Sequence, residues 1–464
     1  MSHSVSASGK PAIVIIGAGT GGMAVAACLR NARVDLDITL IDPAPFHDFQ
    51  PAWTLVGGGI CRPEDARRVL RDCVPPGVRL LAETVTALQP QEQCVRLANG
   101  ALLGYDFLVV AAGMQLNWGA VEGLADALGK GGVTSNYRHD LAPYTAELVQ
   151  GLKGGDALFT QPAGRIKCPG VPQSALCLAA DHFRRTSASV RVHFWSAGTS
   201  AFGIPFYARA LERVMASYGA QTHYGQNLVQ VRACEKIAVF ESCMNGELLR
   251  EEVHYDLLHV VPPQSAPDFI RGSVLADAAG WLEVDRHTLR HVRYANVFGL
   301  GDCTSTPNSK TVSAIQGQIP TVVGNLLQAL RGRDSSESYD GYAACPLVTA
   351  PGKVLLAEFV YGGVAAPSLP LDPRVPRRLY GWVQRVLLPW FYWNILIRGR
   401  GVPTMHRVRY FSDAVPDWGG LPGRWAASLQ RVAARVISAS ALTGGRMAPR
   451  LRAALQQQRE RHGK

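Results

Sequence analysis

The chain has 464 residues, of which 47% are hydrophobic, and it carries a net charge of +11. This length exceeds what one hydrophobic core supports, so we expect two or three domains of an ordinary globular α/β protein rather than a disordered chain. The charge is uneven, because residues 372–464 hold 17 Lys and Arg against four acidic residues. A basic fold that grips nucleic acid along its whole length is therefore excluded.

The N-terminal segment Met1–Lys10 is short and polar. It lacks the apolar stretch of a secretory signal, so we expect the protein to begin its life in the cytoplasm. Ten cysteines are scattered along the chain without CxxC or zinc-type spacing, and we predict no metal site. In a reducing compartment most of them are expected to be packing residues, including Cys28 and Cys94.

The first motif is a strand, a glycine-rich turn, a helix and a second strand. The apolar run Ala12–Ile16 predicts a buried parallel strand, Gly17-Ala-Gly19-Thr20-Gly21-Gly22 follows, and the second strand Asp37–Ile41 ends in Asp42. Such glycines let backbone N–H groups approach a pyrophosphate at a helix N-terminus, and the acid can accept a ribose hydroxyl. In this context the turn predicts dinucleotide binding.

Two later strands suggest which dinucleotide is bound. Residues 105–113 form a strand pattern that ends in Gly113, and residues 296–302 form another that ends in Gly301-Asp302. In flavoproteins with two dinucleotide-binding domains, such segments return the chain to FAD. Together with the opening turn, they favour FAD over NAD.

Two cysteines stand in distinctive local sequences. Cys168 lies in Arg165–Gln173 and Cys345 in Tyr339–Thr349, and each directly precedes a proline. The backbone of each is therefore biased away from helix. Two fixed thiols beside a two-electron cofactor suggest sulfur redox chemistry.

The middle of the chain argues against a second nucleotide. The run Ser189–Phe194 is expected to open a second nucleotide-type unit, but no GxGxxG follows it. Phe202 and Pro205 stand where a nicotinamide pyrophosphate needs bare backbone. We therefore expect no NADH site.

The C-terminal region becomes aromatic and basic after Pro367. The apolar run Val386–Ile397 is too short to span a bilayer and is interrupted by Pro389, so we expect it to lie at a membrane interface. Segments 425–440 and 448–459 have the pattern of Arg-rich amphipathic helices.

The predicted organisation has five parts. Residues 11–150 form a first Rossmann-like FAD domain and 151–285 a second one that lacks an NAD fingerprint. Residues 286–330 return to the FAD domain, 331–400 carry the second redox cysteine, the quinone site and the membrane interface, and 401–464 form a basic tail.

On these motifs the sequence resembles the sulfide:quinone oxidoreductases, in the two-cysteine branch that includes the mitochondrial enzymes. The resemblance spans about residues 11–400 and rests on the 17–22 turn, both cysteine segments, Gly301–Thr304, Ser309–Thr311 and Leu388–Asn394. It implies a disulfide-reductase-like α/β flavoprotein with two Rossmann-like domains. It also implies that sulfide is oxidised to sulfane sulfur and that ubiquinone is reduced, at the cytoplasmic face of the inner membrane.

The resemblance assigns roles residue by residue. Cys168 and Cys345 match the redox pair, with Cys168 facing the flavin and Cys345 carrying the exported persulfide. A small thiol or sulfite would accept that sulfur, and a homo-oligomer is possible. Besides the glycines 17, 19, 21, 22 and 113, the matching FAD positions are Thr20, Asp42, Gln50, Val85, Gly301, Asp302 and Lys310. The candidate quinone walls are Phe359, Tyr361, Phe391, Tyr392 and Trp393.

Three other readings stay open at this point. A type II NADH:quinone oxidoreductase shares the fold and membrane habit but needs a second glycine-rich turn. A flavocytochrome sulfide dehydrogenase subunit would be exported. A flavin-binding persulfide sensor or carrier would lack steady-state quinone turnover.

Overall fold

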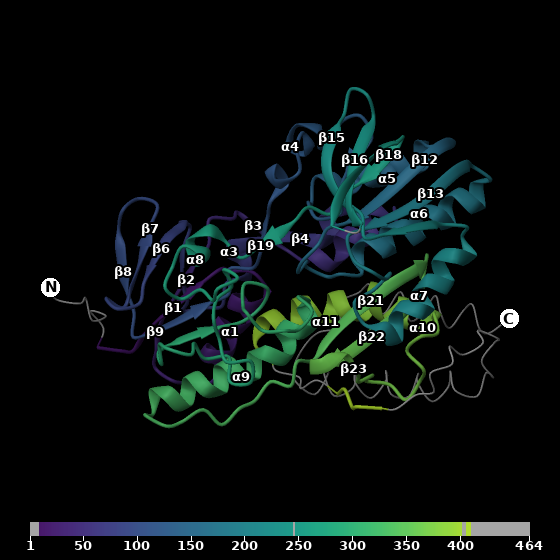
Figure 1. The fold of residues 1–464 in the computed structure, drawn as a ribbon. Coiled ribbons are helices and arrows are strands. Elements are labelled where there is room, and N and C mark those ends of the chain that lie inside the picture. Colours follow the sequence, from purple (N-terminus) through teal and green to yellow (C-terminus); the bar gives the residue numbers. More distant parts are fainter. Residues whose placement is uncertain (1–8, 245, 401–404, 410–464) are drawn as a thin grey trace.

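The structure is a computed structural model that describes residues 9–244, 246–400 and 405–409. It contains two parallel sheets built on one plan (Figure 1). The predicted helices at 425–440 and 448–459 lie outside the described residues.

The first sheet has the order β20-β9-β1-β2-β5. Its strands are β1 (Ala12–Ile16), β2 (Asp37–Ile41), β5 (Arg79–Leu81), β9 (Phe107–Val110) and β20 (Val297–Gly299). The predicted strands at 12–16 and 37–41 are confirmed to the residue. β1 is buried because it pairs with β2 on one side and β9 on the other, as an apolar run in a parallel sheet requires.

Helices α1 (Thr20–Asn31) and α9 (Val312–Leu330) belong to this first domain. α9 begins with a capped turn, since the Thr311 side chain accepts the N–H of Ala314, and it continues through Pro320. A meander of β6 (Val85–Gln89), β7 (Cys94–Leu97) and β8 (Leu102–Gly104) is inserted before β9. Cys28 lies on α1 and packs against the first hydrophobic core, and Cys94 lies on β7 and is buried.

The second sheet has the order β11-β18-β12-β13-β14. Its strands are β11 (Val133–Thr134), β12 (Gly154–Gln161), β13 (Ser189–Ser196), β14 (Gln221–Tyr224) and β18 (Leu257–His259). Helices α5 (Leu141–Gly151), α6 (Val171–Thr186) and α7 (Pro205–Ser217) accompany it, and a second meander is formed by β15 (Asn227–Arg232), β16 (Ile237–Met244) and β17 (Glu247–His254).

One expectation about this sheet is wrong. The run at 189–194 is predicted to open the second nucleotide-type unit, but β12 precedes β13 and occupies the central position that β1 holds in the first sheet. β12 escaped recognition because it begins with Gly154-Gly155-Asp156, which has the composition of a loop. The connection from β12 to α6, residues 162–170, is therefore the counterpart of the glycine-rich turn after β1.

A third sheet and a bent helical segment complete the described chain. β21 (Ala343–Ala350), β22 (Lys353–Val360) and β23 (Val364–Ala365) form an antiparallel sheet. The segment after it contains α10 (Arg378–Trp382), a π-helical turn at Val383–Leu387, and α11 (Leu388–Asn394). Among the described residues, no helix has the length and apolar character that a membrane crossing needs.

Candidate active site

The first glycine-rich turn closes tightly against the sheet. Gly17 has φ +95°, and a Cβ added there would stand 2.5 Å from the carbonyl oxygen of Ala111. A Cβ on Gly22 would collide with the carbonyl oxygen of Gly17, so Gly22 allows α1 to pack directly on the turn. Only glycine fits either position without displacing backbone.

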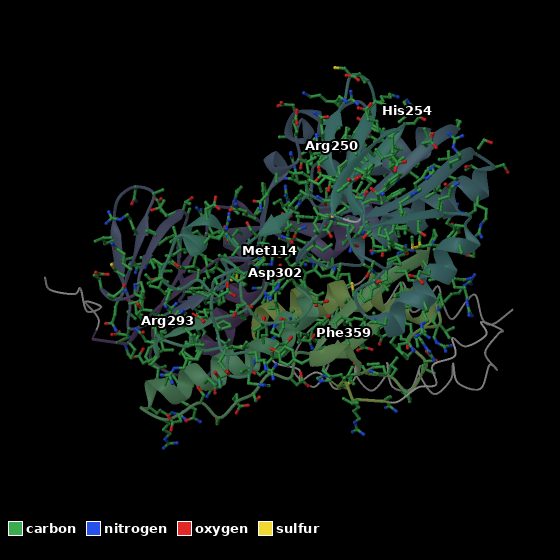
Figure 2. The ribbon with its side chains drawn as sticks, viewed as in Figure 1. Met114, Arg250, His254, Arg293, Asp302 and Phe359 are labelled. Atoms are coloured by element: carbon green, nitrogen blue, oxygen red, sulfur yellow. The ribbon has the colours of Figure 1, made fainter. Side chains whose placement is uncertain are left out.

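A cavity of about 940 Å³ begins at this turn and reaches the C-terminal helices. It lies at the carboxyl ends of the strands of the first sheet, where open α/β sheets bind ligands. Met114 and Asp302, which both line it, lie near each other between the two sheets (Figure 2). Of the predicted cofactor positions, those that line the cavity are Gly17, Gly19, Thr20, Gly21, Asp42, Gln50, Gly113, Gly301, Asp302 and Lys310.

The cavity residues fit a dinucleotide. Asp42 accepts the N–H of Ala18 at 2.7 Å, so its carboxylate is fixed beside the turn. At the other end Asp302 is buried, and its Oδ1 has no hydrogen-bond partner among the described residues. A buried carboxylate oxygen is costly to leave unpaired, and a ligand hydroxyl would satisfy it.

Two lysines stand beside Asp302. Lys167 Nζ lies 3.2 Å from Asp302 Oδ2 and donates to Gln50 Oε1 at 2.7 Å. Lys310 is 2% exposed, and its Nζ donates to the carbonyl oxygens of Thr304 at 2.7 Å and Thr306 at 3.1 Å. Burial lowers the pKa of Lys310 to about 8. The two ammonium groups offer positive charge next to a ligand that gains negative charge.

The two predicted redox cysteines meet at the edge of the cavity. The Sγ atoms of Cys168 and Cys345 are 3.8 Å apart, although 177 residues separate them in sequence. Cys168 lines the cavity, whereas Cys345 is fully buried on β21 behind it. A Cβ on Gly170 would stand 2.8 Å from Cys345 Sγ and collide with Leu347, so this glycine gives the sulfurs room to approach.

The surroundings shift the pKa values of the two thiols in opposite directions. The hydrogen bond from the Cys345 thiol lowers the pKa of Cys168, assisted by the N–H of Gly170 and the charge of Lys167. The same hydrogen bond, together with burial, raises the pKa of Cys345 well above its ordinary value. Cys168 is therefore the thiolate of the reduced pair, and thiolates are the reactive form of cysteine.

The backbone of Cys168 is held in an uncommon conformation. Its φ of +46° lies in the left-handed region, which non-glycine residues rarely adopt. The Cys168 N–H donates to Lys310 O at 2.8 Å, and the Tyr137 hydroxyl donates to Lys167 O at 2.8 Å. These contacts fix the loop that presents the sulfur, a typical arrangement of strained residues at reactive sites.

Two further polar groups of the cavity lack partners. Asn136 is buried, and neither its amide nitrogen nor its amide oxygen is hydrogen-bonded among the described residues. The indole nitrogen of Trp53 is likewise buried and unpaired. Asn136 packs against Gly57, one turn after Trp53 on α2 (Trp53–Gly57), so both groups belong to the same part of the cavity.

The C-terminal helix α11 closes the opposite wall. Leu388, Pro389, Trp390 and Trp393 line the cavity, and the Arg68 guanidinium lies 4.2 Å from the centre of the Trp393 ring. The neighbouring Tyr392 is buried, and its hydroxyl is 2.8 Å from Thr20 Oγ1 and 2.7 Å from His47 Nε2. α11 is thus attached directly to the glycine-rich turn.

Several predicted positions lie outside the cavity lining. Val85 is buried at the start of β6, and Gly22 serves packing. Among the aromatic candidates, Trp393 lines the cavity but Phe359, Tyr361, Phe391 and Tyr392 do not. Phe359 is buried in the second core, where it contacts Phe202, and the Tyr361 hydroxyl donates to Arg286 O at 2.7 Å. Phe391 packs against the first core.

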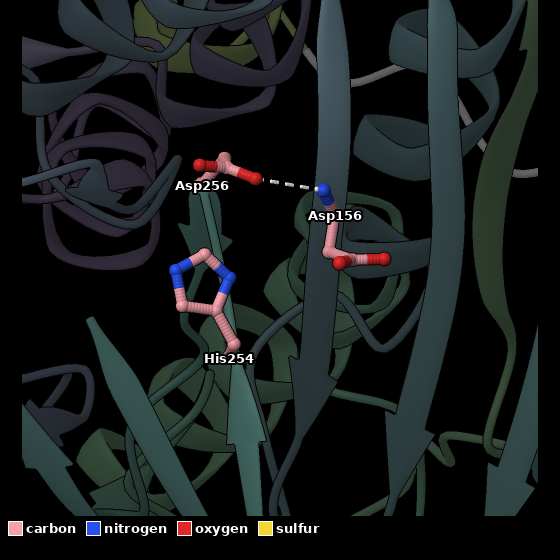
Figure 3. A group of neighbouring side chains, drawn as sticks. All are labelled: Asp156, His254 and Asp256. Carbon is pink, nitrogen blue, oxygen red and sulfur yellow. Dashed lines mark hydrogen bonds between the residues drawn. The ribbon is translucent and has the colours of Figure 1, made fainter. Parts of the chain in front are cut away.

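A separate group of potential metal ligands lies where the second sheet meets the second meander. Asp156, His254 and Asp256 come within reach of one ion, and Asp256 Oδ2 accepts the N–H of Asp156 at 3.0 Å (Figure 3). Asp156 already forms an ion pair with Arg191, and Asp256 lies 3.7 Å from Lys236. These two cations offset both carboxylates, so the group is explained by its own ion pairs.

Comparisons with known proteins agree with this geometry. Residues 11–148 match the family model described as pyridine nucleotide-disulphide oxidoreductase. A mitochondrial sulfide:quinone oxidoreductase of Dictyostelium discoideum is 39% identical over 84% of this chain and 86% of its own length. The crystal structure of the sulfide:quinone oxidoreductase from Aquifex aeolicus aligns with a TM-score of 0.69 at 20% identity, over 84% of this chain and 92% of that one. A type II NADH:quinone oxidoreductase of Mycobacterium tuberculosis is 37% identical over only 24% of this chain.

Sequence reasoning missed four residues of the site. Asn136 and Tyr137 are adjacent and Trp53 lies in the matched stretch Phe49–Gly57, but neither these three residues nor His47 could be assigned a role from the sequence. Their importance arises from where the fold places them, either against the Cys168 loop or around the cavity. The one usable signal was their position in segments that flank the motifs.

Proposed function

Because the chain belongs to the sulfide:quinone oxidoreductase family, we propose that it oxidises sulfide to sulfane sulfur through Cys168 and Cys345 and passes the electrons through FAD to ubiquinone. The observation that carries the proposal is the cysteine pair itself. Two sulfurs 3.8 Å apart stand at the wall of a dinucleotide-sized cavity, and one of them lines it. A site for the hydride donor NADH would have no use for these thiols.

The sulfur chemistry follows from the two cysteines. In the oxidised enzyme they form a bridge, which requires the sulfurs to close to about 2 Å. Hydrosulfide attacks Cys345 Sγ, the bridging S–S bond breaks, and its electron pair remains on Cys168 as a thiolate. Cys345 then carries the persulfide. Cys168 is the better leaving group, because its pKa is the lower of the two.

The bound flavin would accept two electrons as the Cys168 and Cys345 thiolates re-form their bridge, after the outer persulfide sulfur has been transferred to an acceptor, and it would donate them to a quinone. The residues that would hold it are the 17–22 turn at the pyrophosphate, Asp42 at the ribose and Asp302 at the ribityl hydroxyls. Lys167 and Lys310 would stabilise negative charge on the reduced ring. FAD is favoured over a mononucleotide because the cavity extends from Asp42 to Cys168.

The quinone would bind where α11 meets α2. Trp390, Trp393 and Leu388 supply apolar walls, and the unpaired indole N–H of Trp53 offers a donor to a quinone oxygen. Phe359, Tyr361 and Phe391 lie outside this lining, so of the predicted quinone contacts Trp393 is kept, and Leu388 and Trp390 are added.

A small acceptor such as sulfite or a low-molecular-weight thiol would remove the persulfide sulfur. Cys345 is fully enclosed, which favours a small nucleophile over a protein thiol. We expect sulfide-dependent reduction of a short-chain ubiquinone to accelerate when sulfite or glutathione is added. Turnover driven by NADH at a similar rate, with none driven by sulfide, would overturn the proposal and favour the NADH dehydrogenase reading.

The segment from α10 to α11 would rest on a membrane. Leu379, Val383, Val386 and Leu387 are all partly exposed, although they are apolar. Arg378, Arg385 and Arg400 are exposed nearby, and they suit a negatively charged leaflet such as the cytoplasmic one. Such a segment fits the interface rather than the bilayer interior.

Vesicle sedimentation tests the membrane contact. The double variant Val383→Glu/Leu387→Glu places two carboxylates one turn apart on this segment and should reduce binding to anionic vesicles about tenfold or more. Val292→Glu is a matched control, because Val292 is apolar and 54% exposed on the first domain. Equal binding of the double variant and the wild type would rule out this surface.

A further inference from the structure

Three polar side chains form a chain of hydrogen bonds between α11 and the glycine-rich turn. They are Thr20 at the start of α1, His47 on β3 (Phe46–Asp48) and Tyr392 on α11. His47 Nδ1 is 2.9 Å from Ala18 O, His47 Nε2 is 2.7 Å from the Tyr392 hydroxyl, and that hydroxyl is 2.8 Å from Thr20 Oγ1. Tyr392 is thereby joined to His47, 345 positions earlier in the sequence, and to Thr20, 372 positions earlier.

The direction of these bonds is determined by the first one. A carbonyl oxygen only accepts, so His47 Nδ1 carries the proton that Ala18 O receives. Burial lowers the pKa of His47, which leaves the ring neutral and makes Nε2 an acceptor. Tyr392 therefore donates to His47 and, with its oxygen lone pairs, receives the Thr20 hydroxyl proton.

The hydrogen-bonded side chains of His47 and Tyr392 are buried in apolar surroundings. His47 is 2% exposed and Tyr392 is 1% exposed, and both lie within the first hydrophobic core or against it. The Tyr392 ring packs on Phe49 with centroids 4.5 Å apart and on Trp393 at 5.1 Å. A buried polar group without a partner is costly. Moving α11 would break these hydrogen bonds, so they favour the one position of α11 in which all of them form.

We propose that Tyr392 is a positioning residue that couples the seating of α11 to cofactor retention by the glycine-rich turn. The inference rests on the proposed FAD site. The Thr20 hydroxyl is hydrogen-bonded to Tyr392, and Thr20 belongs to the turn residues that line the cavity. Any ligand that orders this turn then also stabilises α11, and α11 in turn stabilises the ligand, since coupling between two sites is reciprocal.

Reciprocity gives two crossed measurements on the holoenzyme. Tyr392→Phe keeps the packed ring but deletes the hydroxyl, and we expect FAD to dissociate about tenfold faster, measured by the rise of free-flavin fluorescence. Thr20→Val changes only the turn, and we expect faster amide hydrogen exchange in peptides that cover 388–396 of α11. Each variant is thus read at the site that it does not alter.

Tyr207→Phe is the matched control. Tyr207 is a fully buried tyrosine whose hydroxyl donates to Glu358 O at 2.7 Å, in the second core and outside the cavity lining. Its removal should leave both readouts at the wild-type value, which separates coupling from general loss of stability.

Two results would overturn the inference. One is wild-type FAD dissociation from Tyr392→Phe, and the other is unchanged α11 exchange in Thr20→Val. A purified wild-type protein without bound FAD would instead defeat the proposed function, so the two failures are distinguishable. In a double variant, effects on FAD dissociation that simply add would also contradict coupling through this bond.

Discussion

The two parallel sheets share the order of four strands, β9-β1-β2-β5 in the first and β18-β12-β13-β14 in the second, but differ in the connection that follows β1 and β12. In the first, β1 leads to α1 through Gly17–Gly19, a short turn whose bare backbone faces the cavity. In the second, β12 leads to α6 through residues 162–170, which carry Cys168. The connection that would hold a cofactor phosphate in one domain corresponds to the connection that carries Cys168 in the other.

The difference teaches how one architecture serves two chemistries. Both connections lie at the carboxyl edge of a parallel sheet and precede a helix, where ligands meet α/β folds. In the glycine turn, the Gly17 N–H donates to Ile41 O and the Ala18 N–H donates to Asp42, which fixes the turn on the sheet. In the 162–170 loop, the Cys168 N–H donates to Lys310 O and Lys167 O accepts from the Tyr137 hydroxyl, which fixes Cys168. On the proposed mechanism the second domain would deliver electrons from sulfur to the first, and no GxGxxG sequence follows β12.

The largest effect should come from removing the sulfur itself. Cys168→Ser or Cys345→Ala should retain FAD but lose at least about a thousandfold in sulfide-dependent quinone reduction, because no bridge can form. Absorbance of bound flavin checks the cofactor, and a short-chain ubiquinone assay checks turnover. Wild-type turnover in either single variant would break the comparison at its centre.

A smaller effect should follow from crowding the second connection. Gly170→Ala adds a methyl group against Leu347 and Cys345 Sγ, so the sulfurs separate, and we expect a 10- to 100-fold loss in sulfide turnover. Gly203→Ala serves as the control, since nothing lies within 4 Å of its added Cβ. If the two variants behave alike, the close approach of the sulfurs does not limit catalysis.

The smallest effect concerns the acidity of Cys168. In the reduced enzyme its alkylation by iodoacetamide should rise with pH around a midpoint below that of an ordinary thiol, since the Cys345 hydrogen bond favours the thiolate. Cys345→Ala removes that donor and should move the midpoint upward by about one pH unit. A downward shift, or none, would show that Cys345 does not stabilise the thiolate.

Much of the first domain could be read from sequence because its signals are local. The apolar runs at 12–16 and 37–41 and the glycines between them determine strand, turn and helix within one stretch of chain. The cysteine pair was also predicted, through the resemblance of two separate segments to one family. Its 3.8 Å separation needed the fold, since β21 and the 162–170 loop meet only in three dimensions.

The predicted aromatic quinone contacts show what the sequence alone could not predict. Phe359 and Trp393 are both aromatic residues in apolar segments, yet one enters the second core and the other faces the cavity. The face that a side chain presents depends on the register of β22 and on the π-helical turn before α11, and neither has a sequence signature. The hydrogen bond between His47 and Tyr392 could not be predicted from the sequence for the same reason.

The central claim is tested most directly by anaerobic stopped-flow absorbance of the flavin, with the purified protein mixed with sulfide and, separately, with NADH. The account predicts rapid bleaching by sulfide, reversed by a short-chain ubiquinone, and no bleaching by NADH on that timescale. Bleaching by NADH, with sulfide inert, would contradict it and would mean that the 162–170 connection serves a nucleotide rather than a sulfur.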